Sequence, residues 1–291
     1  MEKITLLTKH RKAAAIYAAL ANCGFKICTV DSFNTDQLGT FTGERSRSES
    51  LRDTALHKAK LAAQLGNTRY GLGSVGSFGL DPLIGMTAWN TEVLACWDAV
   101  EQHAVYAQTN GPETNYSQKY VHAMDDALQF MSQCKFPSHG IIVGKPGESD
   151  FYKNVNTVEE MTELLALLLP QSGVWLETDM RAHRNPTRMR MIERCSKRLA
   201  MNLLSVCTAC NKAGFIAVAQ IPGAACESCG AATGAARAEL FSCASCGHEE
   251  ERKLSSLAPT SRCNHCNPLL KRRAGISAPR QRDSQLVQLL R

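Results

Sequence analysis

The sequence contains no long hydrophobic run and no signal for secretion. Its longest apolar stretch, residues 13–21, is mostly alanine and falls far short of the roughly 20 residues that a membrane-spanning helix needs. The N-terminal segment MEKITLLTKH lacks the continuous apolar region of a secretory signal peptide. We therefore expect a cytoplasmic protein that does not interact with membranes.

The sequence also lacks the glycine pattern of a P-loop and has no linker rich in proline and serine before residue 204. Hydrophobic residues make up 44% of the chain and charged residues 21%, which is typical of an ordinary soluble protein. A chain of 291 residues is long enough for one core of about 200 residues and a small additional module. These properties leave the oligomeric state open.

Positive charge is concentrated at the C-terminus. The chain has a formal net charge of +6, and residues 269–291 hold six basic residues against one acidic residue. A basic tail attracts polyanions such as nucleic acid through counterion release. A disordered end that keeps a protein soluble has the same composition, so both interpretations remain for this tail.

Eight of the 13 cysteines form four CxxC pairs after residue 205. Two thiolates three positions apart bind one metal ion from a tight turn, and two such turns complete a tetrahedral zinc site. The sequence therefore predicts two structural zinc ions, since four protein ligands leave no open position for catalysis. The expected ligands are Cys207, Cys210, Cys226, Cys229, Cys243, Cys246, Cys263 and Cys266.

The spacing of the CxxC pairs leaves their combination open. A sequential arrangement joins the first pair with the second and the third with the fourth, whereas a nested arrangement joins the two middle pairs. Iron–sulfur clusters or redox-active dithiols are the alternatives to zinc. Residues 205–268 are too few for a core that folds without metal, so we expect a double zinc ribbon there.

Before the cysteines, strand patterns alternate with helix patterns. This order predicts an α/β domain over residues 1–204, with a mixed sheet flanked by helices. The expected strands are 4–8, 26–30, 70–74, 92–108, 140–144 and 174–176, and the expected helices are 13–23, 50–66, 122–134, 158–169 and 186–204. The segment GLGSVGSFG, residues 71–79, is interpreted as a glycine-rich turn that lets a ligand approach the backbone.

Two segments of this domain carry clustered charges at the ends of expected strands. In TKHRK, residues 8–12, a strand leads into a helix whose first backbone N–H groups are available to an anion. In VWLETDMRAHRNPTRM, residues 174–189, Asn185 and Pro186 mark the start of a helix. Ligands of open α/β sheets bind beyond the carboxyl ends of strands, so we interpret both segments as parts of a binding site. Solvated surface charge is the alternative.

Three short motifs resemble the inosine triphosphate pyrophosphatase and Maf-like superfamily, whose members hydrolyse damaged or deaminated nucleoside triphosphates with magnesium. Residues 8–12 resemble its opening phosphate motif. FTGE (41–44) and TALHKA (54–59) resemble its acidic loop and lysine-bearing helix. Residues 182–184, Ala-His-Arg, resemble its Ser-His-Arg base-reading motif.

The resemblance implies a cytoplasmic, magnesium-dependent nucleoside triphosphate pyrophosphatase-like hydrolase in the first domain. The expected catalytic residues are Glu44 and Asp179, which would hold magnesium, and Lys58, which would neutralise phosphate charge. The expected substrate-binding residues are Thr8, Lys9, His10, Lys12, Ser74, Ser77, Arg181, His183 and Arg184. Among them, His183 with Arg184 would read the edge of the base.

One departure from the superfamily concerns Val75, which stands where its members usually carry a carboxylate that serves metal or water activation. Either another acid takes that role, such as Glu44, Asp36 or Asp179, or the protein binds a nucleotide without hydrolysing it efficiently. An adaptor that binds nucleic acid or a protein through its zinc ribbons and basic tail is therefore the alternative function.

A longer resemblance covers nearly the whole chain. GTFTGERSRSES, GSFG, ETNYS and WLETDMRAHRNPTRM, followed by the CxxC pairs, resemble an uncharacterised bacterial family, a domain of unknown function. This resemblance implies no activity. It does imply that the α/β domain and the zinc ribbons belong together.

Overall fold

The computed structural model describes residues 1–8, 11–30, 50–144 and 151–267. The chain forms two compact units, Met1–Leu203 and Leu204–Arg291. Some of the expected features lie outside the described residues, namely Lys9, His10, Asp36, Glu44 and the basic tail 269–291. None of the described helices is long and apolar enough to span a membrane.

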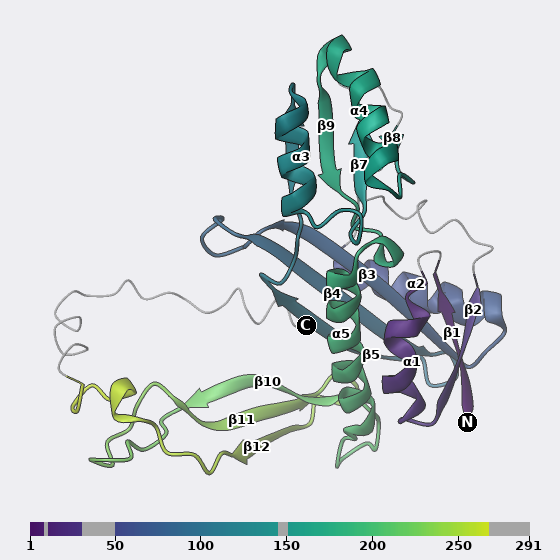
Figure 1. Ribbon diagram of the computed structural model, residues 1–291. Coiled ribbons are helices and arrows are strands. Elements are labelled where there is room, and N and C mark those ends of the chain that lie inside the picture. The colour runs from purple at the N-terminus through teal and green to yellow at the C-terminus, as the bar shows by residue number, and fades with distance from the viewer. Residues whose placement is uncertain (9–10, 31–49, 145–150, 268–291) are drawn as a thin grey trace. The chain divides into compact units, whose positions relative to one another are not determined.

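The first unit contains a five-stranded mixed sheet in the order β2-β1-β3-β4-β5 (Figure 1). Its strands are β1 (Glu2–Leu7), β2 (Phe25–Val30), β3 (Tyr70–Leu80), β4 (Ala88–Asp98) and β5 (His103–Gly111). Strand β1 pairs in parallel with β2 and β3, and the last three strands are antiparallel. The single strand expected over residues 92–108 is therefore a hairpin of two strands.

Helices α1 (Ala13–Ala21) and α2 (Leu51–Gly66) connect the parallel strands. The start of α2 follows from the sequence, because the Ser50 side chain accepts a hydrogen bond from the Asp53 backbone N–H. Alanines of α2 pack with Val75, Val93 and Trp97 on one face of the sheet. Burial of this apolar face holds the helix against the strands.

The expected glycine-rich turn is wrong, since residues 71–79 lie within the continuous strand β3. Glycines occur in this strand because the backbone of α2 packs closely against it. A Cβ atom on Gly71 would lie 1.9 Å from the carbonyl oxygen of Ala59, and one on Gly73 would lie 1.9 Å from that of Ala55. Only a residue without a side chain fits at these two positions.

The turn between β3 and β4 is organised by Asp81. This buried carboxylate accepts hydrogen bonds from the backbone N–H groups of Leu83, Ile84, Met86 and Thr87 at 2.8–3.2 Å. These bonds, with that from Ile84 the largest contributor, lower the pKa of Asp81. The turn is thus held by an ionised side chain together with Gly85, whose φ of 67° lies in the left-handed region.

A second sheet of four strands has the order β6-β9-β7-β8. It consists of β6 (Gln118–Val121), β7 (Ile141–Gly144), β8 (Phe151–Tyr152) and β9 (Val174–Thr178). Helices α3 (Met124–Gln133) and α4 (Val158–Ser172) pack on it through a core that includes Phe130, Met161 and Leu165. Helix α4 begins with a capping box, in which Thr157 and Glu160 bond reciprocally.

Strand β9 leads through a short 3₁₀ turn (Ala182–Arg184) into α5 (Pro186–Leu204). Helix α5 begins and ends at the residues that the sequence predicts. The Asn185 side chain accepts a hydrogen bond from the Arg188 backbone N–H at 2.9 Å, which is the interaction of an N-terminal cap. The cap and the following proline together fix where the helix starts.

The second unit is built on a three-stranded antiparallel sheet of β10 (Phe215–Pro222), β11 (Ala236–Cys243) and β12 (Glu249–Lys253). Its small core contains Phe215, Phe241 and cysteines of the CxxC turns. So few buried apolar residues cannot stabilise a fold by themselves, which makes the cysteine turns central to this unit.

Candidate functional site

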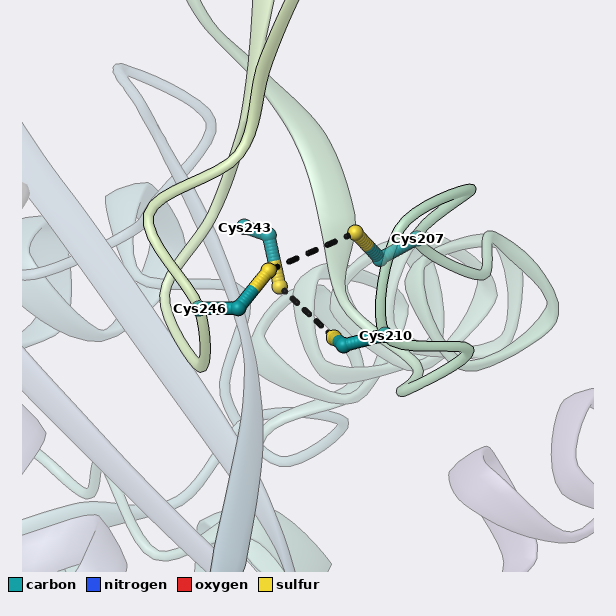
Figure 2. A group of neighbouring side chains, drawn as sticks. All are labelled: Cys207, Cys210, Cys243 and Cys246. Atoms are coloured by element: carbon teal, nitrogen blue, oxygen red, sulfur yellow. Dashed lines mark hydrogen bonds between the residues drawn. The ribbon is translucent and has the colours of Figure 1, made fainter.

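The cysteines of the second unit gather in two groups of four. In the first group, the Cys207 and Cys246 sulfurs are 3.7 Å apart and the Cys210 and Cys243 sulfurs are 3.6 Å apart. Figure 2 shows these four side chains pointing toward one another from two separate turns. No disulfide joins them, and the separations are much longer than the about 2.05 Å of a disulfide bond.

The second group has the same geometry. The Cys226 and Cys266 sulfurs are 3.9 Å apart, and those of Cys229 and Cys263 are 3.6 Å apart. A tetrahedral zinc ion bound at about 2.3 Å holds its sulfur ligands about 3.8 Å apart. Each group could therefore hold one zinc ion with four thiolates, a closed coordination sphere typical of structural sites.

Both expected combinations of the CxxC pairs are wrong, because the structure joins the first pair with the third and the second with the fourth. The reason is the topology of the sheet. Phe215 at the start of β10 pairs with Cys243 at the end of β11, which brings the first and third turns together. At the other end, Cys226 forms a bridge with Ala258 beyond β12, which brings the second and fourth turns together.

Backbone amides favour the thiolate form of one cysteine in each group. Burial raises the pKa of Cys207, but hydrogen bonds from the backbone N–H groups of Cys210 and Ala209 and from neighbouring thiols outweigh it and bring the pKa to about 6. The backbone N–H of Cys266 is the main cause that lowers the pKa of Cys263 to about 7. In each group, one thiol therefore loses its proton more readily, and the resulting thiolate is the form that binds a cation.

In the first unit, Lys12 and Ser74 lie in direct contact. Lys12 immediately precedes α1 and is only 7% exposed. Its ammonium donates to the main-chain oxygen of Ser74 at 3.1 Å and to the Ser74 hydroxyl at 3.2 Å. Thr8 is buried at the end of β1. A lysine held at the start of a helix, above the centre of a sheet, offers charge and backbone N–H groups to an anion.

Asp179, Arg181 and Arg184 form a compact charged cluster after β9. The fully buried Asp179 carboxylate accepts two bonds of 3.0 Å from Arg181 Nε and one of 2.7 Å from its Nη2. Arg184 donates to Asn156 and to the main-chain oxygen of Val155, each at 2.7 Å. Arg181 also donates to the main-chain oxygen of Lys153, so both guanidinium groups hold the chain that precedes α4. Arg181 thereby also engages the carboxylate that was expected to bind magnesium.

His183 projects from the same cluster. Its side chain is exposed, but partial loss of solvent around the ring is still the main cause that lowers its pKa. The positive charges of Arg181, Arg184 and Arg11 lower the pKa further, whereas Asp179 raises it. Arg11 adjoins Lys12 in the chain, and its charge reaches His183, so the start of α1 and the turn after β9 lie near each other. The two charged segments of the sequence are therefore neighbours in the fold.

Near these segments lies a buried ion pair, Glu92–Arg188, that was not predicted from the sequence. The two side chains are 0% exposed, and Arg188 Nε lies 2.8 Å from Glu92 Oε1. Arg188 also donates to the main-chain oxygen of Met180. A Cβ on Gly76 would lie 2.3 Å from Glu92 Oε1, so glycine makes room for the pair. The available signal was a lone glutamate within the otherwise apolar strand TEVLACW.

Alternation along β3 separates the other expected residues. Ser74 and Gly76 face Lys12 and the ion pair, whereas Val75 packs against α2 on the opposite face. Ser77 is half-buried on the Val75 face. Lys58 is half-buried on α2, the helix that covers this opposite face. Ser74 and Ser77 therefore cannot contact one ligand from the same side of the strand.

A family model described as a domain of unknown function (DUF6671) matches residues 58–268. The chain belongs to the DUF6671 family. The matched region includes β3, the ion pair, the cluster after β9 and all eight CxxC cysteines, while the Lys12 segment precedes it. No curated protein and no solved structure matches the chain.

Proposed function

We propose that this DUF6671 protein is a hydrolase of nucleoside triphosphates, similar to the pyrophosphatases that remove damaged or deaminated nucleotides. The observation that carries the proposal is the buried Lys12 ammonium, held by Ser74 at the start of α1. Its charge is desolvated and its direction is fixed, which strengthens its attraction for a phosphate group. Phosphoryl transfer depends mainly on such positioned positive charge.

His183 supports the second half of the proposal, the recognition of a base. It lies next to Arg181 and Arg184, whose contacts with the chain before α4 hold the turn in place. Partial loss of solvent and these cations favour its neutral form, which carries one hydrogen-bond donor and one acceptor. In this proposal Arg181 and Arg184 position His183, and Asp179 positions Arg181.

Magnesium enters the proposal through the resemblance alone. The only metal-binding groups among the described residues are the two cysteine groups. Arg181 engages both oxygens of Asp179, so Asp179 does not fit a magnesium site in this arrangement. We therefore derive no catalytic step through a protein-bound magnesium ion, and the metal would reach the site bound to the phosphates of the nucleotide.

The test is hydrolysis of a panel of nucleoside triphosphates, including inosine, xanthosine and the four common ones, with magnesium present. Pyrophosphate release is expected from at least one of them. Lys12→Met should reduce the rate at least 100-fold, because a transition-state contact to phosphate is lost. Lys26→Met, which removes an exposed lysine on β2, is the matched control. Absence of pyrophosphate release from every nucleotide would refute the proposal.

The two cysteine groups favour an adaptor as the second candidate function, because closed four-thiolate sites build binding surfaces and not catalytic centres. Residues 205–267 contain five basic and five acidic residues, so nucleic-acid binding would depend on the tail. Binding of RNA or DNA that weakens with salt, and is lost when the chain ends at Asn267, would support this function. Equal binding by the shortened chain would argue against it.

A further inference from the structure

The most unusual polar group of the first unit is the side chain of Asn90 on β4. Asn90 is 0% exposed, yet neither its amide oxygen nor its amide nitrogen has a hydrogen-bond partner among the described residues. Complete burial also leaves no room for a water molecule beside the amide. Native proteins rarely bury a carboxamide in this way, because the lost hydrogen bonds to water are not replaced.

The neighbours of Asn90 are aromatic and cationic. Phe78 lies directly opposite Asn90 in the β3–β4 ladder, so both side chains leave the sheet on the same face. The ring of Tyr116 lies over Phe78, with centroids 6.1 Å apart and planes inclined by 31°. The Arg188 guanidinium lies 5.1 Å from the Phe78 ring. Phe78 and Tyr116 are half-buried, so this pair of rings is partly open to solvent, and its Phe78 member lies beside the buried Asn90.

This aromatic pair shares its sheet face with the Lys12 site. Ser74, which holds Lys12, and Phe78 are four residues apart on the same side of β3, a separation of about 14 Å. Gly76 lies between them, with the Glu92–Arg188 pair above it. An extended nucleoside triphosphate is long enough for this separation, so a ligand that passes outside the buried pair would have its terminal phosphates near Lys12 and its base near Phe78.

We propose that Phe78, Tyr116 and Asn90 form a closed slot for the base of a nucleotide. Entry of the base would displace the Tyr116 ring from Phe78, stack the base on Phe78 and give the Asn90 amide its missing partners. This inference rests on the proposed function, because the phosphates of the same ligand would lie at Lys12. The cost of the unpartnered amide in the empty protein is recovered only when a base binds, which makes the slot selective.

The chemistry of the amide defines the ligand class. A carboxamide presents one acceptor beside one donor. Its complement is a base edge with a donor next to an acceptor, such as the 6-oxo and N1–H edge of hypoxanthine or the amino and ring-nitrogen edge of adenine. A purine without an exocyclic group offers no such pair, so the slot should discriminate against purine riboside triphosphate.

The experiment compares ligand affinities by calorimetry without magnesium, so that no turnover occurs. The ligands are inosine triphosphate, adenosine triphosphate, purine riboside triphosphate and inorganic tripolyphosphate. Of inosine triphosphate and adenosine triphosphate, the nucleotide that binds more tightly to the unaltered protein should bind about 10- to 100-fold more weakly to Asn90→Leu. Binding of tripolyphosphate should be unchanged. Lys12→Met should instead weaken tripolyphosphate and nucleotides alike.

Thermal unfolding separates a ligand-binding role of Asn90 from a structural one. Asn90→Leu removes an unpartnered amide and should raise the unfolding temperature. If Asn90 stabilised the fold, the same substitution would lower the unfolding temperature. Asn202→Leu is the matched control, because the Asn202 amide donates to the Tyr106 carbonyl oxygen at 2.7 Å, and its loss should lower the unfolding temperature. Tyr116→Leu provides a second variant of the slot, with weaker nucleotide binding and unchanged tripolyphosphate binding expected.

Each result has one meaning. A lower unfolding temperature for Asn90→Leu, or unchanged nucleotide affinity in both Asn90→Leu and Tyr116→Leu, overturns the slot. If the unaltered protein binds tripolyphosphate and nucleotides equally tightly, the slot is overturned while the phosphate site stands. If it binds neither, the proposed function and the slot are both overturned.

Discussion

Removal of either member of the buried pair Glu92–Arg188 should strongly destabilise the first unit. Both side chains are 0% exposed and joined at 2.8 Å, so a single substitution leaves the other charge buried without its partner. The cost of such an isolated charge is about 3–5 kcal/mol. Arg188→Met and Glu92→Gln should each approach this loss, which is a large part of the roughly 5–15 kcal/mol by which a domain is stable.

The double substitution Glu92→Leu with Arg188→Met should cost much less than the two single changes together. It leaves no buried charge, and its main penalty is the Met180 carbonyl oxygen, which loses the hydrogen bond from Arg188. One unsatisfied buried carbonyl costs about 1–3 kcal/mol. We therefore expect a double-mutant coupling of several kcal/mol between the two positions.

Urea unfolding followed by tryptophan fluorescence measures the free energy of unfolding of the first unit, because all three tryptophans precede residue 204. The control is the exposed pair Arg194–Glu113, which is joined at 2.9 Å and has side chains 54% and 55% exposed. Its loss should cost at most about 1 kcal/mol. Single changes in Glu92–Arg188 that cost no more than this control, or that add up without coupling, would refute the reasoning.

Three further predictions concern the zinc groups, β3 and the Asp81 turn. Cys207→Ser with Cys226→Ser should lose both zinc ions in metal analysis, since the observed combination places them in different groups; sequential pairing would lose one. Gly73→Ala should destabilise the protein by at least about 1–3 kcal/mol in urea unfolding, while Gly79→Ala, with nothing within 4 Å of its Cβ, should be neutral. The lowered pKa of Asp81 stabilises its turn above about pH 4, so the protection of its amides, taken relative to the intrinsic exchange rate at each pH, should decrease as the pH falls below this value, and Asp81→Asn should show low protection even at pH 7.

Elements whose boundaries depend on neighbouring residues could be predicted from the sequence. Helix α5 is an example, because Asn185 and Pro186 determine its start by local hydrogen bonding and a fixed φ angle. The capping box of α4 is another. These signals are contained in four or five consecutive residues, so no knowledge of the remainder of the fold is needed.

Features that depend on distant contacts could not be predicted in the same way. The glycines of β3 are typical of a turn, and only the proximity of Ala55 and Ala59 reveals them as a packing surface. Likewise, each CxxC pair indicates metal ligands, but the combination of the pairs depends on the strand order β10-β11-β12. A local pattern identifies the ligands, and the topology decides which of them share an ion.

The position of Val75 in β3 also depends on distant contacts. A carboxylate at this position would point toward α2 and the apolar residues around Ala55 and Ala59, where ionisation is costly. The face that carries Ser74 receives its carboxylate from the adjacent strand, through Glu92 above Gly76. Valine at position 75 thus leaves the Lys12 face unchanged. Any deficit in hydrolysis would arise from Arg188, which neutralises Glu92, and not from the absence of an acid in β3.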